Sequence, residues 1–123
     1  MKLQIAATDG AKVFTAYGPG YVSINGVRYE NNVAVSAHEV IPAWCGSSFD
    51  CLTLADMEFL AGLAGDVTLL GVPAPLRFPR GELLQPFVAA QKGLEVMELG
   101  AACRTFNILV GEGRRVVVGL LLA

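Results

Sequence analysis

The end of the chain places the tightest constraint on its fold. Residues 100–111 are mostly apolar, carry a short polar cluster, and are followed by a glycine-rich stop at residues 111–113. This pattern predicts a helix that ends at the glycines. The next run, residues 116–123, is apolar and about eight residues long. A helix needs roughly twenty apolar residues to cross a membrane, so we expect a final strand that is buried on both faces.

Asn25-Gly26 predicts a β-hairpin near the start of the chain. These two residue types suit the central positions of a type I′ turn, where φ is positive at both. Pairing across a two-residue turn places alternate side chains on opposite faces. One predicted face holds Val22, Ile24, Val27 and Tyr29, and the other holds Tyr21, Ser23, Arg28 and Glu30.

Between the hairpin and the closing segment, the pattern alternates between strand and helix. A Thr53 cap predicts a helix that ends at Gly65, and a second helix is expected within residues 79–92. Pro86 should kink that second helix or delay its start, because proline lacks the amide and clashes with the preceding turn. Short apolar runs predict strands at 33–36, 67–70 and 94–97, and an irregular connection with Trp44 spans 38–51. This order predicts an α/β fold with three helices, a layered sheet and an N-terminal β-hairpin, in one domain over residues 1–123.

The composition of the chain argues against some classes of binding partner. The 123 residues are 54% apolar, carry a formal net charge of −2, and have their basic residues scattered among acidic ones. We therefore expect no nucleic-acid partner. Residues 1–10 lack the features of an export signal, and no segment is long enough for a transmembrane helix. Three cysteines, an odd number, fit free thiols in a reducing cytoplasm.

The thiols are the first candidates for chemistry. Cys103 is expected in the first turn of the last helix beside Arg104, where the helix dipole and the guanidinium both favour a thiolate. The alternative is a small core residue, because its neighbours are apolar. His38, Cys45, Cys51 and Cys103 together would make a zinc set, but no pair has the C-x-x-C spacing of such sites. Cys45 and Cys51 could instead close a loop by forming a disulfide.

Arg104 and Asn107 are the second candidates. They lie three residues apart on one side of the predicted helix, so together with the free amides at its start they could hold an anion or a partner's carboxylate. The alternative is a structural network in which Asn107 pairs with nearby backbone and Arg104 with Glu112 or Glu98. Arg77 and Phe78 follow the predicted strand 67–70, at the end of a parallel sheet where ligands gather. No glycine-rich nucleotide motif or paired carboxylates stand out.

A family resemblance rests on several stretches of the sequence. These are GAACRTFNILVGEGRRV from residue 100, INGVRYENNVAV from residue 24, the loop residue Trp44, and LLGVPAPLRFP from residue 69. They resemble a small family of uncharacterised domains that includes the mitochondrial respiratory complex I assembly factor 3 and the adipogenesis-associated protein. The resemblance implies a compact α/β domain whose mixed sheet has its last strand antiparallel to its neighbours. It implies assembly or interaction roles, and it does not imply a reaction.

These observations lead to a functional hypothesis. We expect a three-layer, cytoplasmic binding or assembly factor without enzymatic activity, cofactor or metal. Its binding rim would comprise Arg77, Phe78, Cys103, Arg104 and Asn107, and it would take a protein partner or a small anion. One alternative is a small-molecule enzyme that uses a Cys103 thiolate. Another is a homo-oligomer whose apolar patches serve only self-association.

Overall fold

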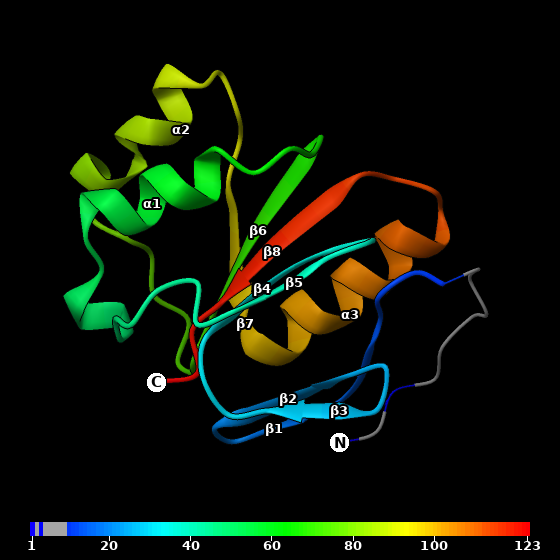
Figure 1. Ribbon diagram of the computed structural model, residues 1–123. Coiled ribbons are helices and arrows are strands. Elements are labelled where there is room, and N and C mark those ends of the chain that lie inside the picture. The colour runs from blue at the N-terminus through cyan, green and yellow to red at the C-terminus, as the bar shows by residue number, and fades with distance from the viewer. Residues whose placement is uncertain (2, 4–9) are drawn as a thin grey trace.

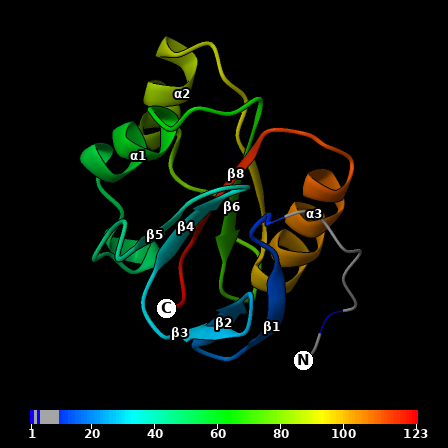
Figure 2. The ribbon, with the colours of Figure 1, turned by 45° about the vertical axis from the view of Figure 1, so that its right-hand side comes forward.

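The computed structural model describes residues 1, 3 and 10–123 of the chain (Figure 1). The expectation that residues 1–10 are not an export signal falls mostly outside these described residues. The described part contains two sheets and three α-helices. A five-stranded sheet lies between two helical layers, and a three-stranded antiparallel sheet packs below one end of it (Figures 1 and 2). The predicted α/β fold with three helices is therefore confirmed in outline.

The five-stranded sheet has the order β5-β4-β8-β6-β7. Its strands are β4 (Val33–Ser36), β5 (Val40–Pro42), β6 (Val67–Val72), β7 (Glu95–Glu98) and β8 (Val116–Leu120). The final strand β8 lies in the middle and is buried throughout, as its apolar sequence predicts. It pairs antiparallel with β4 but parallel with β6. The expectation that the last strand runs antiparallel to its neighbours is therefore wrong on one side.

The N-terminal sheet consists of β1 (Phe14–Gly18), β2 (Tyr21–Ile24) and β3 (Val27–Tyr29). The predicted hairpin is confirmed, because Val22 pairs with Tyr29 and the turn residues Asn25 and Gly26 have φ values of 48° and 84°. Strand β1, which the sequence analysis did not identify, pairs antiparallel with β2. The appendage is thus a three-stranded sheet.

Two helices cover one face of the main sheet. Helix α1 (Leu54–Ala61) begins with the predicted Thr53 cap, and the Asp56 side chain reciprocates by accepting from the Thr53 amide. The helix stops at Gly62, three residues earlier than expected. Helix α2 (Gln85–Ala89) follows a 3-10 turn at Gly81–Leu84, so Pro86 lies in its first turn, where no amide donor is needed. The delayed start that Pro86 predicts is confirmed.

Helix α3 (Leu99–Gly111) covers the opposite face and also contacts β1 (Figure 2). Its buried residues, Ala102, Cys103, Phe106 and Val110, follow helical spacing and join one apolar core with the strands of both sheets. The Phe106 ring packs edge-on against Phe14 of β1, with ring centroids 5.2 Å apart. A second apolar core lies on the other face beneath α1 and α2. The predicted irregular connection 38–51 contains strand β5 and a 3-10 turn at Phe49–Cys51, so it is more ordered than expected.

Candidate functional site

A pocket of about 580 Å³ opens at the start of α3. It lies where the parallel strands β6, β7 and β8 end, because each contributes its last residue or the residues just beyond it. In open α/β sheets, ligands bind at the carboxyl ends of the strands. The lining residues are Tyr17, Gly18, Pro19, Gly20, Pro73, Ala74, Glu98, Leu99, Gly100, Ala101, Arg104, Leu121 and Leu122. The small sheet thus closes one side of the pocket and the main sheet closes the other.

The first turn of α3 lies against an aromatic ring from the other sheet. A Cβ atom on Gly100 would lie 2.7 Å from Tyr17 Cε1 and 2.9 Å from its hydroxyl oxygen, so only glycine lets the ring approach this closely. Glu98 occupies the N-cap position but makes no side-chain capping hydrogen bond. The first amides of a helix have no partner within the helix and carry a partial positive charge. The start of α3 therefore contributes partial positive charge to this wall of the pocket, beside the Glu98 carboxylate.

Among the described residues that line this pocket, Arg104 supplies the only cationic side chain. It is exposed, its guanidinium donates to the Tyr17 hydroxyl, and it lies 5.9 Å from the centre of the Tyr17 ring. The structural alternative paired Arg104 with Glu98 or Glu112, but its guanidinium bonds to Tyr17 instead. A guanidinium has five N–H donors. One bond to Tyr17 therefore orients the side chain and leaves donors for a bound anion.

Cys103 does not reach this pocket. Helix α3 begins at Leu99, so Cys103 is in the second turn rather than the first. That position turns the side chain toward the core, where it has no solvent-exposed surface. Burial raises the pKa of the Cys103 thiol to about 12, against the smaller lowering effect of Arg104. The expectation of an accessible thiol beside Arg104 is wrong.

Asn107 has a structural role in this arrangement. Its amide nitrogen donates to the Phe14 carbonyl at 2.9 Å, and its amide oxygen accepts from the Phe14 amide at 2.8 Å. The side chain therefore pairs with the outer edge of β1 as a neighbouring strand would. This agrees with the structural alternative for Asn107, although the backbone that it satisfies lies 93 residues away in sequence.

Arg77 and Phe78 lie apart from Arg104. The Arg77 guanidinium bonds to Asp50 at 2.9 Å and stacks over the Phe49 ring. Phe78 lines a small hollow with Leu52 and Leu83, which belong to the core beneath α1 and α2. Arg104 is on the helix that covers the opposite face. The structure therefore does not bring the five predicted site residues together, because the connection after β6 turns toward α1 and α2.

The fold recurs in known proteins. A family described as "Protein of unknown function (DUF498/DUF598)" matches residues 14–121. The chain belongs to this family. It is 36% identical to an uncharacterised protein of Rhodobacter capsulatus over 91% of this chain and 86% of that protein. A crystal structure from Bordetella parapertussis matches with a TM-score of 0.83 and 35% identity over 94% and 98% of the two chains. A solution structure from Bordetella pertussis, described as a Mth938-like domain, gives 0.78 and 29% over 98% and 92%.

Another relative of this family member has a name that refers to a membrane. A Francisella tularensis protein called "13 kDa major membrane protein" is 23% identical over 94% of this chain and 95% of that protein. In the residues that the structure describes, no helix is long and apolar enough to cross a bilayer.

The remaining sulfur and histidine candidates are also separated in this family member. Cys45, Cys51 and Cys103 are all free, so the loop-closing disulfide is not formed. Among residues 10–123, no three side chains of the types that bind metals come together, and the zinc set with His38 is not assembled. Asn32 instead donates to the carbonyls of Cys45 and Ser47, and its oxygen accepts from the Leu122 amide at 2.9 Å. These hydrogen bonds connect the loop that contains Cys45 and Ser47 to the segment just after β8.

Thiol labelling tests the placement of the cysteines. We expect iodoacetamide at pH 7.5 to modify exposed Cys51 quickly, and Cys103 only after unfolding, because its pKa is about 12 and it is buried. Mass spectrometry of the native and urea-unfolded protein gives the sites and rates. The Cys51→Ser variant should then show almost no fast labelling. Rapid native labelling of Cys103 would contradict this placement and revive the thiolate alternative.

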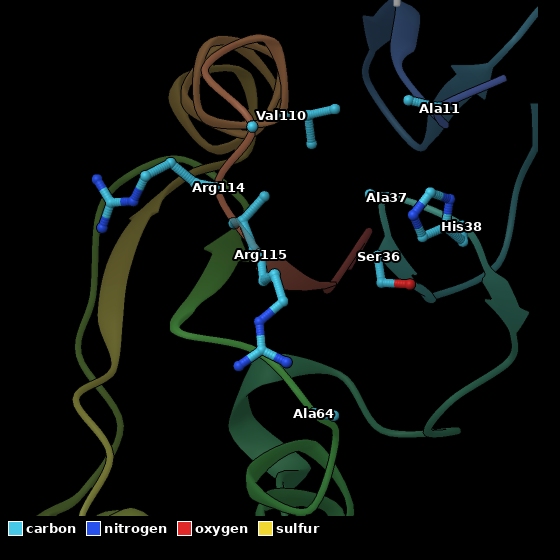
Figure 3. A pocket seen from close by; sticks show the side chains of 10 residues that line it. Ala11, Ser36, Ala37, His38, Ala64, Val110, Arg114 and Arg115 are labelled. Atoms are coloured by element: carbon cyan, nitrogen blue, oxygen red, sulfur yellow. The ribbon is translucent and has the colours of Figure 1, made fainter. Parts of the chain in front are cut away.

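A second hollow lies at the opposite end of α3, and sequence reasoning missed it. Its volume is about 300 Å³, and its lining includes Ser36, His38, Val110 and Arg115 (Figure 3). Arg115 is already paired with Asp66, through contacts of 2.8 and 3.1 Å, and this pairing lowers the pKa of that carboxyl. The Arg114 side chain points away from the hollow (Figure 3). This hollow therefore offers less uncompensated positive charge than the pocket at Arg104.

Proposed function

We propose that this chain is a cytoplasmic binding or assembly factor without catalytic activity, and that its pocket at the start of α3 captures an anionic group. The observation that carries the proposal is the Arg104 guanidinium, held by Tyr17 beside the first-turn amides of α3. Guanidinium forks and helix N-termini both favour anions, and their effects combine when they face the same space. The anion would belong to a small molecule or to a carboxylate of a partner protein.

A protein partner and a small-molecule ligand are supported by different observations. The resemblance to a family that includes a respiratory complex I assembly factor favours a protein partner. The pocket volume of about 580 Å³ also suits a small molecule. The alternative enzyme with a Cys103 thiolate finds less support, because that thiol is buried on the sheet side of α3. Both binding interpretations require the same guanidinium, so one variant tests them together.

Anion titrations followed by NMR test the proposal. We expect inorganic phosphate and acetate to shift the Gly100 and Ala101 amide signals in a saturable way, because both residues line the pocket in the first turn of α3. The Arg104→Ala variant should weaken this binding at least tenfold with little change in melting temperature, since its side chain is exposed.

Arg77→Ala is the matched control, because that guanidinium is bound to Asp50 on the other face of the sheet. It should leave the anion-induced shifts unchanged. If neither anion produces saturable shifts, or if Arg104→Ala binds as the parent does, the proposed function is wrong. A large loss of stability in Arg104→Ala without a binding defect would assign Arg104 a structural role.

A further inference from the structure

Polar side-chain groups form only a small part of the lining of the pocket at Arg104. Arg104, Glu98 and the Tyr17 hydroxyl provide the polar side-chain groups among the described residues that line it. The rest of the side-chain lining is apolar and comes from both sheets and from the first turn of α3. It consists of Pro19, Pro73, Ala74, Leu99, Ala101, Leu121 and Leu122. A small inorganic anion would leave this apolar surface uncovered, so the lining favours a ligand with an apolar body.

The charges favour a single negative charge on that ligand. Arg104 contributes one positive charge to the lining and Glu98 one negative charge. The start of α3 adds roughly half a positive charge. The lining thus carries roughly half a positive charge, so a monoanion leaves about half a negative charge, whereas a phosphate dianion would leave about one and a half near Glu98. The guanidinium fork also matches the planar geometry of a carboxylate.

Tyr17 positions the guanidinium at the boundary between these two parts. Its hydroxyl accepts from Arg104, and its ring lies against Gly100 at the helix start. The ring also lines the pocket, so one residue orients the charge and provides an apolar contact. Tyr17 is thus a positioning residue for the proposed anion.

From these three features we infer that the pocket binds a monocarboxylate on an apolar body. This inference rests on the proposed function, since it names the ligand class for the same site. The carboxylate would bind to Arg104 and the amides of Gly100 and Ala101, and the body would contact Leu121 and Leu122. Such a group can come from a free aliphatic or aryl acid, or from the C-terminal residue of a peptide.

Titrations with matched probes test this inference on the intact chain. The probes are octanoate, acetate, methyl octanoate and inorganic phosphate, followed by NMR at the Gly100 and Ala101 amides. Octanoate should bind at least tenfold tighter than acetate, because burial of two of its additional methylenes is enough for that gain. It should also bind at least tenfold tighter than phosphate or the uncharged ester.

Two variants separate the charged and apolar contributions. Arg104→Met keeps an apolar stem without charge, and it should remove most of the difference between octanoate and its methyl ester. Leu122→Ala should weaken octanoate severalfold and leave acetate unchanged, because only the apolar lining shrinks. Tyr17→Phe should weaken both acids while leaving the ester unchanged, since the guanidinium loses its partner. Melting temperatures confirm that each variant is folded.

The source of the carboxylate is distinguished by a tripeptide that ends in leucine, compared with its C-terminal amide. Preference for the free carboxylate of the peptide over octanoate indicates a partner's C-terminus, and the reverse indicates a free acid. If acetate binds through Arg104 but octanoate binds no tighter, the ligand class is wrong and the proposed function stands. If no anion binds, both are wrong. Octanoate binding that is unchanged in Arg104→Met also overturns the inference.

Discussion

Replacing Asn107 with leucine should lower the free energy of unfolding by about 3 kcal/mol, which corresponds to a drop in melting temperature of roughly 10 °C. Both atoms of the Asn107 amide bond to the backbone of Phe14 in part-buried surroundings. Leucine has a similar size but neither donor nor acceptor. The Phe14 amide and carbonyl would then be left without partners, which costs more than the bonds themselves contribute. Urea unfolding followed by circular dichroism measures the change.

The matched control is Asn31→Leu, the same substitution on the exposed loop between β3 and β4. We expect it to change stability by less than about 0.5 kcal/mol. Native-state hydrogen exchange adds a local readout, because the Phe14 amide should lose protection selectively in Asn107→Leu. Equal stability of the two variants would show that the asparagine bridge does not hold the small sheet to α3.

Replacing Gly71 with valine should destabilise the protein by about 3 kcal/mol through overpacking. Gly71 lies in β6, and a Cβ atom there would be 2.5 Å from Leu120 Cδ2 and 3.0 Å from the Ala102 Cβ. The first neighbour belongs to β8 and the second to α3, so little room can be made without moving the helix away from the sheet. Branching at Cβ adds two further methyl groups to this space. Chemical denaturation measures the loss.

Gly93→Val provides the control for this substitution. Gly93 is exposed, and no heavy atom lies within 4 Å of a Cβ built there. It should therefore change stability by less than about 0.5 kcal/mol. If Gly71→Val were as stable as this control, the close contact between α3 and β6 would not exist in solution.

Local chemistry allowed part of the fold to be predicted from the sequence. Asn25-Gly26 determined the register of the hairpin, and Thr53 with Asp56 marked the start of α1, because both signals act over a few residues. The direction of β8 relative to β6 depends on which strands meet in the sheet, and no local signal encodes that choice. Strand β1 was missed for a related reason, since its edge away from β2 pairs with the distant Asn107 side chain and with the backbone of Met1 and Leu3.

The site was predicted only in part, and the errors have physical causes. Arg104 lies at the pocket as expected, because the helix start does meet the strand ends. Cys103 was misplaced because α3 begins at Leu99, one residue before the predicted start at Gly100. This shift places Cys103 in the second turn, on the face of the helix that packs against the core. Tyr17 was overlooked because its contacts with Gly100 and Arg104 bridge more than eighty residues. The one available signal was Gly100 itself, a glycine at a helix start that leaves room for a bulky neighbour.

The central place of β8 has a consequence for biosynthesis. Strands β4 and β6 do not pair with each other and are joined only through β8, which follows both of them in the sequence. During synthesis the N-terminal hairpin can form early, but the main sheet can form only after residues 116–120 have left the ribosome. Until then the nascent chain exposes two apolar strand edges, which are prone to pair with other chains.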